Sequence, residues 1–190
     1  MGLDKKHDES VGIRRIEQFD AKDLIGAPFP VILHDSVDEK YDLNSGDVLS
    51  HVIPNVRALI AVVAIMRVAS DQKLNGAEIR FLRKSLARKA KDFAEDVGIS
   101  PEQLSRYENE KQPISLIYER FLRAAACLGH FDEAYGLGID MKKLLTMKVR
   151  SVRPAERNFA VHLCLVPEAC AAELRARESD LHEPAWRNTG

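Results

Sequence analysis

The feature that most constrains this chain is a helix stop followed at once by a helix start. Gly98 tolerates the left-handed backbone at which helices commonly end. Ser100 is a strong N-cap, and Pro101 suits the first helical position, where its missing amide hydrogen would have no partner. The sequence therefore predicts two helices joined by a very short turn, the first over about residues 90–97 and the second from residue 101.

Two further helices flank this pair. The first begins at Asn75, where Glu78 three residues later completes a capping box, and it ends near Ala87. The other spans residues 115–128, and its spacing predicts that five apolar side chains face the core: Ile117, Phe121, Leu122, Ala125 and Leu128. Because these local signals agree with one another, we expect a body of four to five helices over residues 71–129.

The helix that begins at Pro101 leaves most of its surface polar. Only Leu104 and Tyr107 need point inward. The major groove of DNA admits one helix whose outward polar side chains meet base edges. Arg106 can pair with guanine and Gln103 with adenine, each through two parallel hydrogen bonds. This distribution is what a DNA recognition helix requires.

Phosphate contacts are expected around the same helix. Ser100 and Lys111 suit phosphate oxygens, while Asn109 either bonds a phosphate or caps the helix end, and the sequence leaves both roles open. A dense basic run covers residues 83–91, although a solvated helix face is the plain alternative for it. The full set of candidate DNA-binding residues is Lys89, Lys91, Ser100, Glu102, Gln103, Ser105, Arg106, Asn109 and Lys111.

Four stretches of this region are recognisable together: Ile79-Arg80-Phe81-Leu82-Arg83-Lys84, Lys91-Asp92-Phe93-Ala94, Val97-Gly98-Ile99-Ser100-Pro101 and Ser105-Arg106-Tyr107-Glu108-Asn109. They resemble the Xre/Cro-type helix-turn-helix family. The closest likeness is to its MqsA-type antitoxin and regulator branch, in which an Ile-Pro-Asn segment and an apolar helix precede the DNA-binding domain, as residues 53–68 do here. The resemblance covers residues 53–128 and implies a DNA-binding repressor, usually dimeric, on a two-fold symmetric operator.

Two departures from that family bear on function. The second helix of the domain often opens with Gln in the family, but here Ala90 stands between Lys89 and Lys91, so the lysines are expected to contact phosphate. The zinc module of MqsA-type antitoxins rests on CxxC pairs, and residues 1–53 contain no cysteine. Zinc binding is therefore not carried over. The alternative function is an antitoxin that binds a toxin through its acidic N-terminal half and autoregulates its operon, and a mobile-element regulator is a third.

The N-terminal third carries weaker signals. Charged residues dominate 1–24, which we expect to be a mobile arm with a short helix at 13–19. Residues 25–70 are expected to hold short strands and then an apolar helix over 56–68. Because that helix is apolar all round, it must be covered on more than one side. Its apolar run is far shorter than the roughly 20 residues of a bilayer span.

The C-terminal extension over residues 130–190 is expected to contain a helix at 141–147, a strand at 158–166 and a helix at 167–177. We expect its apolar part, residues 158–177, to pack either on the body of the protein or on a second copy, in which case it would serve as a dimerisation segment. The fold class is therefore predicted to be mainly α, with a helix-turn-helix domain, a small β-containing segment before it and an α/β extension after it.

Composition and charge narrow the class of protein. An apolar fraction of 45% and a charged fraction of 30% are typical of a globular chain, and no apolar leader follows the charged opening, so we expect a cytoplasmic protein. The net charge of −1 hides an uneven distribution. Residues 1–50 carry six Lys and Arg against eleven Asp and Glu, whereas residues 73–123 carry eleven against eight. Basic charge gathers where DNA would lie.

Neither an enzyme nor a cofactor is expected. The chain has no Gly-rich phosphate loop, no HExxH and no GxSxG. The spacing of His162, Cys164, Cys170 and His182 matches no common zinc site. The expected partners are double-stranded DNA, a second copy of the chain and, on the alternative function, a toxin or other protein. A four-helix bundle without a nucleic-acid partner is the remaining alternative for the central domain.

Overall fold

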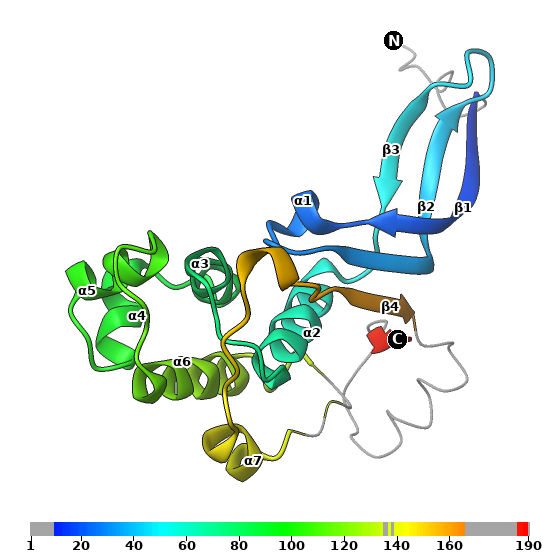
Figure 1. The fold of residues 1–190 in the computed structure, drawn as a ribbon. Helices are drawn as coiled ribbons and strands as arrows, with labels where there is room; N and C mark the ends of the chain where they lie inside the picture. The colour runs from blue at the N-terminus through cyan, green and yellow to red at the C-terminus, as the bar shows by residue number, and fades with distance from the viewer. Residues whose placement is uncertain (1–9, 135–136, 138, 166–185, 190) are drawn as a thin grey trace.

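The computed structural model describes residues 10–134, 137, 139–165 and 186–189. Helix α2 lies between a five-stranded sheet and the helices α3 to α6 (Figure 1). The helices are α1 (Lys22–Ile25), α2 (Val56–Ala69), α3 (Gly76–Ser85), α4 (Ala90–Asp96), α5 (Pro101–Glu108), α6 (Leu116–Gly129), α7 (Met141–Thr146) and a 3-10 turn (Pro154–Glu156). The strands are β1 (Val11–Asp20), β2 (Val31–Asp42), β3 (Val48–Val52), β4 (Val161–Leu165) and β5 (Trp186–Asn188).

The long strand β2 organises the sheet. It pairs with β1 in antiparallel register along its length. Residues 31–34 of β2 also pair with β4 in parallel, and residues 38–41 pair with β3 in antiparallel register. Asp35 lies between these two ladders with a φ of +46°, and Figure 1 shows β1 and β2 strongly bent. The sheet thus has one half against the body of the protein and one half that projects from it as a β1–β2–β3 ribbon.

Helix α2 is buried on nearly all sides. The side chain of Asn55 caps it by accepting a hydrogen bond from the Ala58 amide at 3.0 Å. Leu59, Val62 and Val63 belong to one core cluster that also holds sheet residues and residues of α3 and α6. The expectation that this helix needs cover on more than one side is confirmed. Among the described residues, no helix is both long and apolar enough to cross a membrane.

Two buried ion pairs join α2, α3 and α6. Arg67 on α2 lies 2.8 Å from Glu78 on α3, and Arg123 lies 2.8 Å from Glu119 one turn earlier on α6. Arg123 also donates to the backbone oxygens of residues 68, 70 and 72. Burial lowers the pKa of the Arg123 guanidinium, and the hydrogen bond to Glu119 opposes that shift. A buried charged network therefore lies within the apolar core that these three helices share.

Several expectations for the flanking regions are wrong. The fold is not purely mainly α, because the sheet has five strands. The short helix expected at 13–19 is part of β1, where Arg14 and Arg15 pair across the strands with Glu39 and Asp38.

The strand and short helix expected near 158–166 and 141–147 are present as β4 and α7. The helix expected at 167–177 lies outside the described residues.

The orientation expected for α6 is wrong for three of its five apolar residues. Leu122 and Ala125 are buried or half-buried, but Ile117, Phe121 and Leu128 have exposed fractions of 64%, 56% and 64%. The reason is that the inward face of α6 carries Glu119 and Arg123, which are fully buried. The buried pair rotates the helix, so its large apolar side chains lie in a row on the solvent face.

Candidate nucleic-acid interface

The turn between α4 and α5 has the predicted geometry. Gly98 adopts a φ of +71°, and the amide of Ile99 donates to the Ala94 oxygen at 2.9 Å, which closes the end of α4. The two helices pack through five buried side chains: Phe93, Ala94, Val97, Leu104 and Tyr107. Because both helices contribute to one small core, the outer face of α5 is held in a fixed orientation.

The start of α5 is capped as the sequence predicts. The hydroxyl oxygen of Ser100 accepts a hydrogen bond from the Gln103 amide at 3.1 Å, and Pro101 occupies the first turn. The side chain of Gln103 does not complete the box. Its Nε2 instead donates to the Tyr107 hydroxyl at 2.8 Å, and Gln103 is half-buried. Reading a base with Gln103 would require this bond to break.

The end of α5 is fastened to α3 by buried charge. Glu108 is 9% exposed, and its carboxylate accepts from the Arg83 guanidinium at 2.6 and 3.1 Å and from Arg80 at 3.3 Å. The hydrogen bond to Glu108 raises the pKa of Arg83. In the sequence, Arg83 is recognised only as part of the basic run. Arg80 and Arg83 lie three residues apart on one helix face, and Glu108 follows the inward-facing Tyr107, so this spacing could have predicted the ion pairs.

Asn109 caps the end of α5. Its Nδ2 donates to the Ser105 backbone oxygen at 2.8 Å, and its Oδ1 accepts from Arg80 at 2.8 Å. Of the two roles left open by the sequence, the structure shows the cap. The following residue, Glu110, has a φ of +56°, and the Lys111 amide closes the motif by donating to the Arg106 oxygen at 2.9 Å. Hydrogen bonds therefore fix both ends of α5.

The outer face of α5 presents three exposed polar side chains between these caps: Glu102, Ser105 and Arg106. Hydrogen bonds from its own amide and from the Ser100 hydroxyl lower the pKa of the Glu102 carboxyl, so this group is an acceptor at neutral pH. In the part of the chain that the structure describes, the Arg106 guanidinium makes no hydrogen bond or ion pair, although the charge of Glu102 lies near it. Arg106 thus has its donors available for a ligand.

The candidate phosphate-binding lysines lie at the start of α4 and just after the end of α5. Lys89, Lys91 and Lys111 are exposed, and within the described residues none of their ammonium groups forms an ion pair. Arg88, which is also exposed, is paired with Asp96 at 2.6 Å. Within the basic run, Arg83 and Arg88 therefore form ion pairs with other residues of the chain, whereas the charges of Lys89 and Lys91 face solvent.

No group of three candidate metal ligands lies together in the described ranges. Cys170 and His182 lie outside them. His34 and His162 do meet, with their ring nitrogens 3.0 Å apart across the β2–β4 pair.

Comparison with protein families places a helix-turn-helix domain on this geometry. A family model described as helix-turn-helix matches residues 79–118, which run from α3 to the start of α6. The match supports the Xre-type domain expected from the sequence, but the likeness to the MqsA-type branch is not supported. The comparisons with curated proteins and with solved structures found no match.

Proposed function

We propose that the protein is a transcription regulator that binds double-stranded DNA with α5 in the major groove. The observation that carries the proposal is an exposed row of polar side chains, Glu102, Ser105 and Arg106, on a helix fixed at both ends. Such a helix loses little conformational freedom on binding, so its contacts are not offset by a large ordering cost. The protein would act in the cytoplasm and carry out no catalysis.

Each exposed group has a role in this proposal. Arg106 takes the edge of a guanine through two hydrogen bonds, and Glu102 accepts from the amino group of a cytosine. Gln103 contacts adenine only after releasing Tyr107, so it contributes less than its type alone predicts. Lys89, Lys91 and Lys111 neutralise phosphates, which supplies affinity without sequence preference.

The proposal includes a dimer that represses by occupying a two-fold operator. Its support is the exposed row on α6, which Phe131 extends with an exposed fraction of 74%. In an antiparallel pair of α6 helices centred near Ala124, Phe121 would face the partner's Leu128 and Ile117 would face the partner's Phe131. Two α5 helices about 34 Å apart would then enter successive major grooves, and the bound dimer would obstruct polymerase.

Sedimentation tests the dimer. The parent chain is expected to sediment as a dimer, and Phe121→Asp as a monomer, because a carboxylate would be buried in the interface. Leu145→Asp, on the exposed face of α7, is the matched control and should remain dimeric. A monomeric parent, or a dimer that survives Phe121→Asp, contradicts this surface.

A second candidate function is an antitoxin that binds a protein partner. The observation that favours it is β3, an edge strand whose five residues are all exposed, including apolar Val48, Leu49 and Val52. Exposed edge strands pair readily with a strand from another chain. Co-expression with the product of the neighbouring gene, followed by Leu49→Lys, tests it. A complex that does not depend on β3, or no complex, would reject this surface.

Selection of bound sequences from random duplex DNA at low salt tests the DNA-binding proposal. The parent should enrich one motif with a preferred guanine, and Arg106→Ala should lose that preference, since each such contact contributes about 1–3 kcal/mol of base discrimination. Arg57→Ala removes an exposed arginine at the start of α2 and should select the parental motif. If the parent enriches nothing, or Arg106→Ala selects the same motif with the same affinity, the proposal fails.

A further inference from the structure

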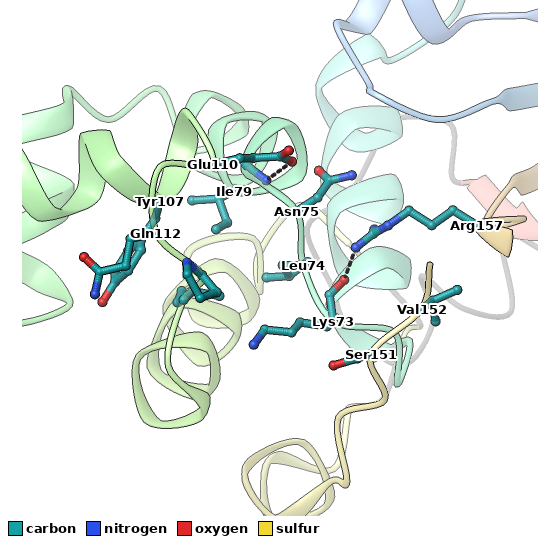
Figure 2. A pocket seen from close by; sticks show the side chains of 13 residues that line it. Lys73, Leu74, Asn75, Ile79, Tyr107, Glu110, Gln112, Ser151, Val152 and Arg157 are labelled. Atoms are coloured by element: carbon teal, nitrogen blue, oxygen red, sulfur yellow. Dashed lines mark hydrogen bonds between the residues drawn. The ribbon is translucent and has the colours of Figure 1, made fainter. Parts of the chain in front are cut away.

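A pocket of about 370 Å³ lies beside the helix-turn-helix core. It is lined by the start of α3, by residues between Tyr107 and Ile114, and by Ser151, Val152 and Arg157 of the C-terminal segment (Figure 2). Its volume is within the range of small-molecule sites. Nothing in the DNA-binding proposal uses this space.

The pocket has an apolar floor. Leu74, Ile79 and Ile114 line it and are at most 4% exposed, and the ring of Tyr107 adds a further apolar wall. These side chains come from the core that holds α3 and α5 together. An apolar ring or short chain could therefore be buried here without moving the backbone.

One cation projects over that floor. The side chain of Lys73 extends toward the middle of the pocket, between Ser151 and the segment that carries Gln112 (Figure 2). Within the described residues its ammonium group forms no ion pair. The backbone of Lys73 is fixed, because its amide donates to Arg150 at 2.9 Å and its oxygen accepts from Arg157 at 2.8 Å. A positioned ammonium over apolar surface is a receptor for an anion.

The carboxylates around the pocket are already engaged. Glu78 is shared by two guanidinium groups, those of Arg67 at 2.8 Å and Arg157 at 3.0 Å. Glu110 accepts from the Gly76 amide at 3.1 Å. Lys73, Arg67 and Arg157 outnumber the two carboxylates, so we expect a net positive charge around the pocket, which favours a negative ligand.

We propose that this pocket binds a small molecule that carries a carboxylate or phosphate next to an apolar ring or chain. The anion binds the Lys73 ammonium group, with the Ser151 hydroxyl as a further donor, and the apolar part packs on Leu74, Ile79 and Ile114. Lys73 is the specificity-determining residue, since it supplies the charge that selects an anion over a neutral molecule.

The position of the pocket couples it to α5. Tyr107 lines the pocket and holds Gln103 on the outer face of α5, and Glu110 lines it directly after the α5 cap. A ligand that contacts these residues and Val152 would bridge the DNA-reading helix and the C-terminal segment. The ligand is therefore expected to change DNA affinity, and this part of the inference rests on the proposed function.

Ligand binding is tested on the full chain without DNA. Amide chemical shifts are followed while phenylacetate, phenyl phosphate or uncharged phenylacetamide is added. Probes of this size are expected to bind in about the millimolar range. The anions should shift the amides of Lys73, Ile114 and Ser151, and Lys73→Met should weaken their binding about tenfold or more. Lys142→Met, an exposed lysine of α7 outside the pocket, is the matched control and should bind as the parent does.

The outcomes separate cleanly. Shifts with only one of the two anions support the site and identify the acid group it takes. Equal binding of phenylacetamide, unchanged binding by Lys73→Met, shifts confined to other surfaces, or no shifts up to about 10 mM would each overturn the proposal. If the anions bind but leave DNA affinity unchanged, the site stands and the coupling is wrong. If the chain binds no DNA at all, the proposed function fails while the ligand titration still decides the site.

Discussion

The helical body and the β1–β2–β3 ribbon both contain ion pairs between arginine and a carboxylate, but the pairs differ in burial. Inside the body, both partners of the Arg123–Glu119 pair are fully buried. In the ribbon, the side chains of Arg15 and Asp38 pair at 2.6 Å but are 50% and 36% exposed. Exposed pairs contribute little to stability, whereas the loss of one member of a buried pair is costly. A few buried charged residues are therefore expected to matter strongly for the stability of the helical body, whereas the ribbon depends mainly on strand pairing.

The largest effect is expected from Glu119→Gln. Its carboxylate accepts from Arg123 and from the Leu74 amide at 2.9 Å, so removing its charge leaves a buried guanidinium uncompensated. We expect a loss of about 3–5 kcal/mol in the free energy of unfolding, measured by urea denaturation. The matched change in the ribbon, Asp38→Asn, should cost less than about 1 kcal/mol. Equal losses from the two changes would remove the distinction between the regions.

A smaller loss is expected from Asn75→Ala. The Asn75 side-chain oxygen accepts from the Glu78 amide at 2.8 Å, and the Glu78 carboxylate accepts from the Asn75 amide at 2.7 Å, so the variant loses one half of a capping box. The expected cost is about 1 kcal/mol, seen as a lower Tm. Asn44→Ala, in the exposed turn between β2 and β3, should change Tm little. A Tm for Asn75→Ala that matches the parent would show that the α3 cap contributes nothing.

A gain is expected from Ala87→Gly. Ala87 has a φ of +52° just after α3, a conformation that L side chains rarely adopt and glycine adopts freely. Replacing it should raise the free energy of unfolding by about 0.5–1 kcal/mol. Asp35, where the ribbon begins on β2, has a φ of +46°, and Asp35→Gly should gain less because aspartate tolerates this region better than alanine. Denaturation of both variants measures the difference, and a larger gain for Asp35→Gly would contradict it.

The smallest effect concerns pH. Burial lowers the pKa of His130, which lies 2.8 Å from the Ser85 hydroxyl. The folded state therefore keeps this ring neutral while the unfolded chain takes up a proton. Its contribution is fully present above the unfolded pKa of about 6.5 and is lost as the pH falls toward the lower folded value. His130→Gln should lose less stability than the parent between pH 7.5 and 5.5, and an unchanged or larger loss would refute this.

The same two regions differ in how far the sequence predicts them. The caps at Asn75 and Ser100 and the stop at Gly98 act over three or four residues, so they are readable without a partner, and the structure confirms them. Strand β1 has no cap or stop residue that marks it in the sequence. Its pairing partners, such as Arg15 and Asp38, lie far apart in the sequence and meet only once the sheet has formed. The pairing of β2 with β4 joins residues far apart in the sequence, such as Val31 and Val161, and it brings the rings of His34 and His162 into contact.

Within the candidate site, the limits of prediction have a physical cause. Residue type and spacing placed Glu102, Ser105 and Arg106 on the outer face of α5, where the structure has them exposed. They did not reveal that Gln103 is engaged by Tyr107, since both residues were assigned by the face they occupy and not by the bonds they form. The spacing of apolar side chains predicts which face of a helix is buried, but it cannot predict that a charged pair is buried. For this reason it predicts Phe121 in the core, where the Glu119–Arg123 pair lies instead.

The most direct test of the central claim asks which region DNA touches. Amide chemical shifts of the full chain are recorded with and without the selected duplex at low salt. We expect changes at residues 89–111, over α4 and α5, and unchanged amides in the ribbon at residues 11–18 and 36–52. Changes concentrated in the ribbon, with α5 unaffected, would contradict it.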